Sequence, residues 1–264
     1  MDIFQAIILA IIEGITEFLP ISSTGHMIIA SSAMGIESEN FTKTYTVMIQ
    51  FGAILSVFAL YWKRLVQSLD IYFKLGLAFI PTAILGFLLN DWIDNLLESP
   101  LTVAISLILG GIVLIFVDKW FKQPEKEPDY FHLSDINAVK IGLFQSISMI
   151  PGISRSASSI IGGMIVGLTR KQAAEFSFLL AIPTMFAASS YKLYKYLKWV
   201  HKNQVLLSSA DLTNLIVGNL VAFVVAIIAI KAFINWLTKY GFKWFGVYRI
   251  LLGVIILMFL WIRK

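Results

Sequence analysis

The sequence predicts an all-α integral membrane protein of about ten helical segments, six of them spanning and four paired into two re-entrant hairpins. Of its 264 residues, 58% are hydrophobic and only 14% are charged. Soluble domains carry about 25% charged residues, so this composition excludes an ordinary soluble fold. Ten apolar segments follow one another along the chain: 3–19, 24–36, 44–62, 73–93, 101–117, 136–150, 156–168, 173–191, 212–234 and 246–262. Short loops join them, which favours one membrane domain over residues 1–264.

Two adjacent pairs of segments are too short to cross the hydrocarbon, which takes about 20 residues of helix. In the first pair, Pro20 and a Ser-Ser-Thr-Gly run interrupt the apolar sequence. In the second pair, Pro151, Gly152 and a Ser-Arg-Ser run interrupt it. We therefore predict that each pair enters the membrane and returns to the same side as a re-entrant hairpin.

The two interruptions resemble each other when Ile21 is aligned with Ile153. This alignment pairs Glu13 with Gln145, Glu17 with Met149, Ser22 with Ser154, Ser23 with Arg155 and Thr24 with Ser156. A weaker match pairs "LILGGIVLIF" (107–116) with "ILLGVIILMF" (250–259). The chain thus reads as two related halves, about 1–121 and 136–264. An odd number of crossings in each half inverts the second half relative to the first, as in many transporters.

The loop charges give a predicted orientation. The connection 90–100 is acidic and has no Lys or Arg, whereas the Lys/Arg-bearing stretches are 62–74, 118–140, 169–172 and 231–249. The positive-inside rule places the basic stretches in the cytoplasm and 90–100 outside. The basic stretch 192–202 departs from this assignment, because it falls on the outer side.

Several classes of protein are excluded at this stage. The chain has no cysteine, so it has no disulfide framework and no thiolate chemistry. Residues 1–19 lack a basic n-region and carry two glutamates, which argues against a cleavable signal peptide. The net charge of +5 reports topology in a membrane protein and predicts no nucleic-acid partner.

Four charged groups remain at membrane depth, namely Glu13, Glu17, Arg155 and, near a helix start, Glu175, with His26 as a further polar group. Each charge at the bilayer centre costs about 2.5–3.5 kcal/mol on insertion scales, so these groups need partners. Glu13 and Glu17 are neighbours on one helix face, where like charges repel. Arg155, a divalent metal ion or a shared proton can each relieve this repulsion.

Both interruptions open onto a helix, and a helix N-terminus favours an anion. Arg155 adds a planar fork that matches phosphate oxygens, and the serines add hydroxyl donors. The carboxylates opposite suit either a metal ion or a general base. These are the groups that phosphoryl transfer needs, so we predict a phosphate or diphosphate site where the two turns meet.

The motifs "EGITEFLPISSTGH" (13–26) and "PGISRS" (151–156) resemble the segments EGxTEFLPxSSTGH and PGxSRS of the undecaprenyl-diphosphatase family, also called the bacitracin-resistance family. The resemblance continues through "YTVMIQFGAILSV" and "RKQAAEFSFLLAIPTM" and covers essentially the whole chain. Members often have Gly after "SRS", where this chain has Ala157. This departure bears on the backbone near the phosphate and leaves Arg155 and the hydroxyls in place.

The resemblance implies an enzyme that hydrolyses undecaprenyl diphosphate to undecaprenyl phosphate and inorganic phosphate, which recycles the lipid carrier for cell-wall synthesis. It also implies a multi-pass protein of the bacterial cytoplasmic (inner) membrane, with a site open to the outer face, and a divalent-cation requirement. The carboxylate pair suits a hard cation such as Mg²⁺ or Ca²⁺. The substrate's prenyl chain is expected to leave sideways into the lipid, and the sequence leaves a homodimer open.

Ser23 is our candidate nucleophile, because it lies in the turn and is paired with Arg155 by the repeat. Glu17 is the nearer base or metal ligand, and Glu13, one turn away, is a metal ligand. His26 is a candidate for protonating the leaving group or for assisting the second step. Direct attack by metal-bound water is the alternative to Ser23.

The remaining polar residues of the turns are expected to hold phosphate oxygens together with Arg155: Ser22, Thr24, Ser154 and Ser156. A function of another class also fits the inverted repeat and the broken helices, namely a transporter or flippase of polyprenyl phosphates. A transporter needs the anion site but neither a nucleophile nor a metal. Phosphate release by the purified protein in detergent, where no two sides exist, discriminates between the two functions.

Overall fold

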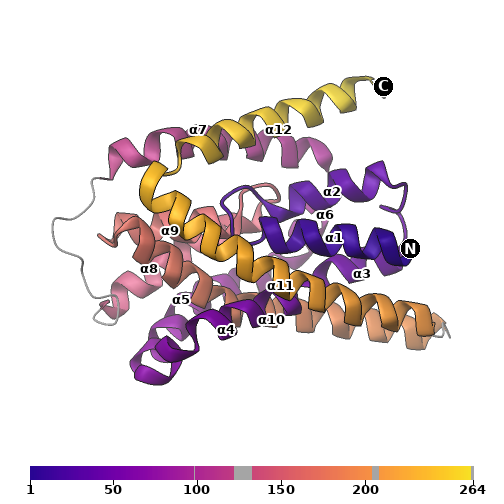
Figure 1. Cartoon of the computed structure of the whole chain (residues 1–264), viewed down its shortest axis with the longest axis horizontal. Helices are drawn as coiled ribbons and strands as arrows, with labels where there is room; N and C mark the ends of the chain where they lie inside the picture. The colour runs from indigo at the N-terminus through magenta and orange to yellow at the C-terminus, as the bar shows by residue number, and fades with distance from the viewer. Residues whose placement is uncertain (98, 122–132, 204–207, 263–264) are drawn as a thin grey trace.

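The computed structural model describes residues 1–97, 99–121, 133–203 and 208–262, and every regular element in these ranges is helical. The elements are α1 (Ile3–Thr16), α2 (Ser23–Ala33), α3 (Asn40–Met48), α4 (Gln50–Gln67), α5 (Asp70–Leu88), α6 (Asn90–Leu97), α7 (Pro100–Trp120), α8 (Asp135–Ser146), η2 (Ile147–Met149), α9 (Arg155–Ile165), α10 (Arg170–Asn203), α11 (Ser209–Tyr240) and α12 (Lys243–Ile262) (Figure 1). Six candidate spans are long and apolar enough to cross a membrane, α3 with α4 counting as one. The predicted all-α membrane fold is confirmed.

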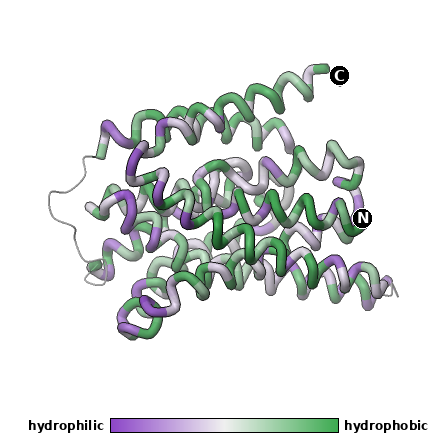
Figure 2. Tube along the Cα trace, in the orientation of Figure 1, coloured by the Kyte–Doolittle hydropathy of each residue, from purple (hydrophilic) through white to green (hydrophobic). Residues whose placement is uncertain are grey.

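The outer surface of the bundle is apolar, as a lipid-facing surface must be. Large hydrophobic side chains are widely exposed, among them Phe87 at 85% and Trp261 at 80%. Figure 2 shows hydrophobic residues along most of the length of the outer helices, with hydrophilic ones gathered at the helix ends. In water such a surface would aggregate, so the arrangement fits a bilayer.

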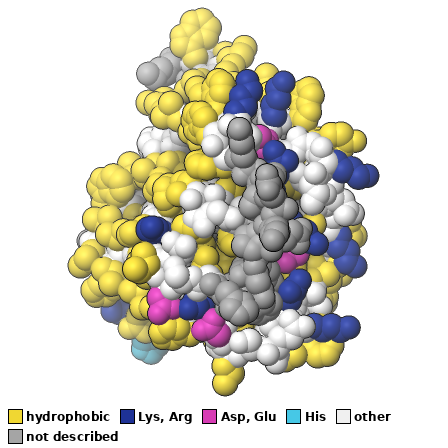
Figure 3. All heavy atoms as spheres, turned by 90° about the vertical axis from the view of Figure 1, so that its left-hand side faces the viewer, with side chains coloured by type: hydrophobic (Ala, Val, Ile, Leu, Met, Phe, Trp, Pro, Cys, Tyr) yellow, Lys and Arg dark blue, Asp and Glu magenta, His cyan; other side chains and the backbone are white. Residues whose placement is uncertain are grey.

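Several basic helix ends gather at one end of the bundle (Figure 3, the left-hand end in Figure 1), whereas the basic stretch 192–202 lies at the far end of α10. Three ion pairs join helix ends there: Arg170–Asp118 (2.7 Å), Arg64–Glu175 (4.0 Å) and Lys74–Asp135. The N–H of Phe242 also donates to Asp118, which brings in the connection between α11 and α12. Residues 122–132 of the predicted basic stretch 118–140 lie outside the described residues.

The two hairpins open on opposite ends of this bundle. Hairpin α8–α9 begins at Asp135 and is followed by α10 from Arg170, both at the basic end. Hairpin α1–α2 opens at the other end, where the N-terminal ammonium of Met1 pairs with Glu39 at 3.0 Å. Asn214, near the start of α11, donates to the carbonyl of Met1 there. The predicted pair of re-entrant hairpins is therefore present, and the hairpins enter from opposite sides.

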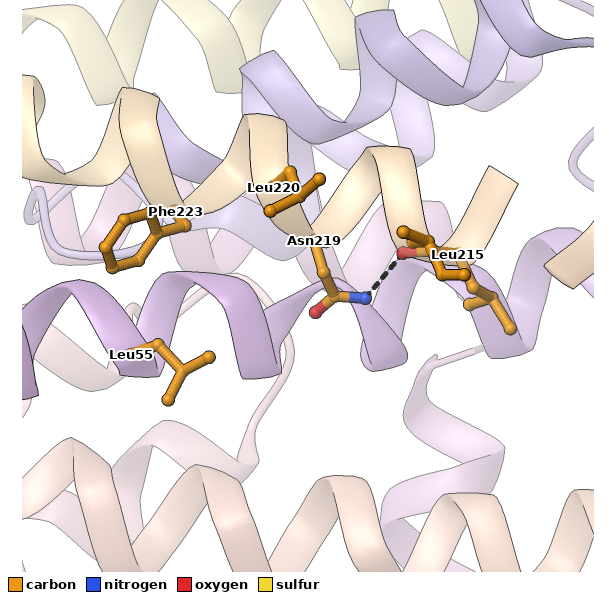
Figure 4. A pocket seen from close by; sticks show the side chains of 6 residues that line it. Leu55, Leu215, Asn219, Leu220 and Phe223 are labelled. Carbon is orange, nitrogen blue, oxygen red and sulfur yellow. Dashed lines mark hydrogen bonds between the residues drawn. The ribbon is translucent and has the colours of Figure 1, made fainter. Parts of the chain in front are cut away.

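The predicted segment 44–62 is divided into α3 and α4 by a break at Ile49. Asn219 of α11 satisfies a backbone donor next to this break, because its Oδ1 accepts from the N–H of Gly52 at 2.7 Å. Its Nδ2 donates to Leu215 O at 2.8 Å, so both ends of the amide are satisfied inside the membrane (Figure 4). Asn219 lies in the wall of an apolar groove of about 470 Å³ between α4 and α11.

Two other elements differ from the expectation. The acidic connection 90–100 contains the short helix α6, which begins only two residues after α5 ends. The stretch 231–249, expected to be a cytoplasmic loop, is wrong as a loop, because α11 runs to Tyr240 and α12 starts at Lys243. As a result Arg249 is not a loop charge, and only 1% of it is exposed.

Candidate active site

The first hairpin turn follows α1 directly and contains a serine in an unfavourable backbone conformation. Glu17 is the C-cap of α1, and Ser22 has a φ of 69°. Ser22 caps α2, and its Oγ accepts from the N–H of Gly25 at 3.5 Å. A non-glycine residue in such a region costs about 1–3 kcal/mol and persists only where its surroundings fix it.

The second turn repeats this conformation. Ser154 has a φ of 22°, caps α9 and accepts from the N–H of Ala157 at 3.2 Å. Among the described residues, Ser22 and Ser154 are the only ones other than glycine with positive φ. They are also the two serines that the Ile21/Ile153 alignment pairs, which supports the equivalence of the turns. The equivalence of the two halves along the rest of the chain stays a prediction.

The two turns contact each other inside the bundle, as predicted. Ser156 Oγ donates to the carbonyl of Phe18 at 2.7 Å, and Ser154 Oγ donates to that of Leu19 at 3.5 Å. Both serines are buried. The hydroxyls that we expected to hold phosphate thus bind the backbone of the opposite turn in this structure. Their role toward phosphate stays a prediction, and their role in joining the turns is visible.

Glu17, Ser23 and Arg155 form one hydrogen-bonded cluster between the turns. Ser23 Oγ donates to Glu17 Oε2 at 2.5 Å, and Arg155 Nη2 donates to Glu17 Oε1 at 3.1 Å. The side chains of Arg155 and Glu17 are 12% and 6% exposed, so the ion pair is largely withdrawn from water. The carboxylate can accept the serine proton from this position. The guanidinium can hold an anion beside the serine.

Several contacts orient the guanidinium of Arg155. Its Nη1 donates to the carbonyl of Ser177 in α10 at 2.9 Å, and its Nη2 approaches Met185 Sδ at 3.5 Å. The guanidinium also lies over the ring of Phe18, 5.7 Å from the centroid. The Nε of Arg155 is buried and has no hydrogen-bond partner. The side chain is therefore held in place, with one buried donor left unsatisfied.

Glu13 lies beside the cluster with an unsatisfied oxygen. It is 1% exposed, and its Oε1 has no hydrogen-bond partner. Gln145, which the alignment pairs with Glu13, likewise has a buried Oε1 without a partner, while its Nε2 donates to Thr82 and Thr184. Unpaired buried polar atoms are rare and mark places where water or an ion binds. The first helix of each hairpin, α1 or α8, thus carries one such oxygen at an equivalent position.

His26 is turned toward α12. Its Nδ1 lies 2.8 Å from the carbonyl of Ser22, and its Nε2 lies 2.7 Å from the hydroxyl of Tyr248. A carbonyl can only accept, so Nδ1 carries the proton and, in the neutral ring, Nε2 accepts from Tyr248. The two rings stack with centroids 5.6 Å apart. The predicted role of His26 as a proton donor stays a prediction, and the structure adds Tyr248 as its partner.

A cation site at the cluster would rest on few protein ligands. No group of three or more His, Cys, Asp or Glu side chains converges anywhere in the described residues. Mg²⁺ sites commonly use one or two carboxylates, with water and substrate phosphate completing the shell. Glu13, with its unpaired oxygen, and Glu17 fit this pattern.

Thr24, expected beside the phosphate, is half-buried.

Sequence reasoning missed two residues of this region, Tyr248 and Arg249. Both sit near the start of the last apolar segment, and the interpretation of 231–249 as a loop hid them. The available signal was the match of 107–116 with 250–259, which extends one residue further to place Arg249 opposite Ser106. A charged residue aligned with Ser106 lies within a helical segment and not in a loop.

Comparison with known proteins shows the family of the chain. The model of the family described as bacitracin resistance protein BacA matches residues 6–255. An undecaprenyl-diphosphatase of Flavobacterium johnsoniae is 57% identical over 258 residues, which cover 98% of this chain and 96% of the relative. One of Bdellovibrio bacteriovorus is 54% identical over 265 residues, covering 99% and 97%. One of Aquifex aeolicus is 47% identical over 256 residues, covering 97% of each.

Proposed function

The chain belongs to the bacitracin resistance protein BacA family and hydrolyses undecaprenyl diphosphate, and we propose that it does so at the Glu17–Ser23–Arg155 cluster. The products are undecaprenyl phosphate and inorganic phosphate. The observation that carries the proposal is the pair of bonds at Glu17, 2.5 Å to Ser23 and 3.1 Å to Arg155. A nucleophile, its base and an anion-binding group are thereby joined where two helices begin.

The first chemical step follows from these contacts. Ser23 Oγ attacks the terminal phosphorus, and its proton passes to Glu17. The bond from that phosphorus to the bridging oxygen breaks, so undecaprenyl phosphate leaves and phosphoserine remains. Arg155 and the N-terminal N–H groups of α2 and α9 stabilise the charge on the phosphoryl oxygens. His26 in its protonated form is proposed to give a proton to the bridging oxygen as undecaprenyl phosphate leaves.

The second step restores the enzyme. Water attacks the phosphoserine phosphorus, its hydroxyl adds to phosphorus, its other proton passes to His26 to replace the one given to the leaving group, and the bond to Ser23 Oγ breaks. The proton held on Glu17 returns to Ser23, and inorganic phosphate is released. Ser22, Thr24, Ser154 and Ser156 line the same turns and are proposed to donate to phosphate oxygens once substrate displaces their present contacts.

A divalent cation fits the carboxylate pair in this scheme. Glu13 would hold it through its unpaired Oε1, with Glu17 as a second ligand. When bound, Mg²⁺ or Ca²⁺ would neutralise charge on the diphosphate. The cation would also remove the repulsion between two carboxylates one helical turn apart.

Glu13→Gln is expected to raise the cation concentration needed for half-maximal activity by about tenfold or more, because it removes a charged oxygen ligand. Exhaustive chelation of the unmodified protein is expected to suppress phosphate release. The measurement is a titration of Mg²⁺ or Ca²⁺ against phosphate release, with Glu37→Gln at an exposed site as the control. Full activity after chelation would leave a shared proton as the explanation of the carboxylate pair.

The site is proposed to open to the outer side of the bacterial cytoplasmic membrane. The basic end of the bundle, with Arg64, Lys74 and Arg170, is then cytoplasmic by the positive-inside rule. Hairpin α1–α2, which carries Ser23, opens at the other end. The prenyl chain is proposed to leave sideways between helices into the lipid, and a homodimer stays a prediction.

Arg155→Lys is expected to lower the rate of phosphate release at least tenfold, about 1.4 kcal/mol of transition-state stabilisation. Lysine is a point charge and cannot bind Glu17, Ser177 and a phosphate through separate nitrogens. The assay uses purified protein in detergent, where a transporter would release no phosphate. Arg170→Lys, at the basic end, is the matched control. Near-normal turnover of Arg155→Lys would remove the cluster as the phosphate site.

A further inference from the structure

Arg249 is a buried cation that the proposed chemistry does not use. It is 1% exposed and is the largest fully buried side chain in the part of the chain that the structure describes. No salt bridge to a carboxylate is formed by Arg249 within the described part of the chain. A charge held in the membrane without a counter-ion is costly. The hydrogen-bond acceptors that compensate this charge therefore indicate the role of Arg249.

Four backbone carbonyls satisfy Arg249, and they come from three separate segments. They are Leu107 O (3.4 Å to Nε), Pro20 O (3.3 Å to Nη1), Ser106 O (3.2 Å to Nη2) and Gly152 O (2.9 Å to Nη2). Ser106 and Leu107 belong to α7, which packs against α12. Pro20 lies in the first hairpin turn and Gly152 in the second. One guanidinium therefore binds both turns.

The carbonyls of Pro20 and Gly152 are equivalent positions of the repeat. Aligning Ile21 with Ile153 places Pro20 on Gly152, each directly before the paired isoleucine. Arg249 therefore makes the same contact with each half, which puts its guanidinium between the two turns. The structural match of Ser22 with Ser154 supports this equivalence independently.

Helices α7 and α12 cross closely at glycines, and the guanidinium of Arg249 lies against one of these glycines, Gly110. A Cβ added at Gly111 would lie 2.7 Å from Gly246 O, and one added at Gly246 would lie 2.6 Å from Gly111 O. A Cβ added at Gly110 would overlap Nη2 of Arg249. The match of 107–116 with 250–259 places Ser106 opposite Arg249, so one half supplies the cation and the other a small residue.

We propose that Arg249 is a positioning residue that sets the spacing of the two hairpin turns by donating to Pro20 and Gly152 at once. Glu17 and Ser23 lie on one turn and Arg155 on the other, so this spacing also sets the geometry of the cluster. This consequence for catalysis rests on the function proposed above. Arginine is required because its three nitrogens diverge in one plane, whereas a lysine has a single nitrogen to share among four carbonyls.

The test compares Arg249→Lys and Arg249→Met with the unmodified chain. The sequence has no cysteine, so cysteines placed at Ile15 of α1 and Leu143 of α8 can be spin-labelled alone. Both side chains face outward, 43% and 52% exposed. We expect the distance distribution between the labels to broaden in both variants, and kcat to fall at least tenfold while KM changes less than threefold. Arg170→Lys, labelled in the same way, should show neither effect.

A second pair of variants keeps Arg249 in the chain. Gly110→Ala places a methyl group against the guanidinium, whereas Gly253→Ala places one against Ile108 and Ala104 of the same helix pair. The repeat match makes Gly110 and Gly253 equivalent, so the two substitutions disturb the same crossing. Gly110→Ala is expected to broaden the distance distribution and lower kcat more than Gly253→Ala. This pair keeps the test usable if the Arg249 variants do not fold.

The two measured quantities, the distance distribution between the labels and kcat, separate this inference from the proposed site. An unchanged distance distribution in the Arg249 and Gly110 variants overturns the positioning role, whatever happens to kcat. A broadened distribution with undiminished phosphate release supports the positioning role and overturns the Glu17–Ser23–Arg155 cluster as the catalytic centre. Broadening together with the loss in kcat supports both.

Discussion

Glu17→Gln is expected to lower phosphate release by about 10²–10⁴-fold, the range that a positioned general base contributes. Glu17 accepts from Ser23 at 2.5 Å and from Arg155 at 3.1 Å, so it contacts both the proposed nucleophile and the proposed phosphate-binding group. Glutamine keeps the size of the side chain but cannot take the serine proton. It also leaves the buried Arg155 without its carboxylate. The measurement is single-turnover phosphate release in detergent at saturating substrate.

Two controls isolate the proton-accepting role of Glu17. Glu175→Gln changes another buried glutamate, which lies in α10 and pairs with Arg64 at the basic end, and should leave turnover within a few-fold of normal. Raising the cation concentration should restore Glu13→Gln, which loses only a proposed metal ligand, but not Glu17→Gln, which also loses the proposed proton acceptor. A Glu17→Gln variant with near-normal turnover would show that another group accepts the proton.

The fold was predictable because the membrane imposes a simple rule on length. Segments shorter than about 17 residues cannot span, and this identified both hairpins from their prolines and polar runs. The break at Ile49 was not predictable in the same way. It depends on Asn219, more than 150 residues away in the sequence, whose side chain satisfies the N–H of Gly52. Such a partner can be found only once α4 and α11 are known to pack together.

The candidate site, like the fold, was predictable only in part from the sequence. The repeat alignment brought Ser23 and Arg155 to equivalent positions, and the structure joins both to Glu17. Rotamers and donors were not predictable, since the hydroxyls of Ser154 and Ser156 donate to the opposite turn and His26 faces Tyr248. These directions depend on the conformation of the turns, which sequence spacing does not specify.

Arg249 escaped prediction for a different reason. A charge at the edge of an apolar segment is ordinarily a loop charge. Arg249 was therefore counted with the basic stretch 231–249 when the positive-inside rule was applied. The structure places it one and a half turns inside α12, beside α7. The repeat match could place Arg249 beside Ser106, but its partners are backbone carbonyls, which every residue has, so the sequence could not identify those of Pro20 and Gly152.

Ser23→Ala is expected to be the most damaging of three alanine substitutions in the first turn, lowering phosphate release by more than about 10³-fold. Removing a donor to phosphate costs about 10²–10³ in rate, whereas removing a nucleophile deletes the covalent route. Ser22→Ala removes the cap of α2, worth about 1 kcal/mol of stability, and a proposed donor to phosphate, so it should lower both the melting temperature and, by no more than about 10³-fold, the rate. Thr24→Ala should lower the rate by no more than a lost donor does.

The Ser23→Ala protein should still fold and bind the lipid diphosphate, because the ion pair of Glu17 with Arg155 and the contacts between the turns do not involve Ser23 Oγ. Phosphate release by the three purified variants is measured side by side. Acid quenching of the unmodified protein during turnover should trap phosphate on Ser23, and the Ser23→Ala protein should trap none. If Ser23→Ala retains more activity than Ser22→Ala or Thr24→Ala, the nucleophile is a water molecule, and Ser23 serves only to orient Glu17.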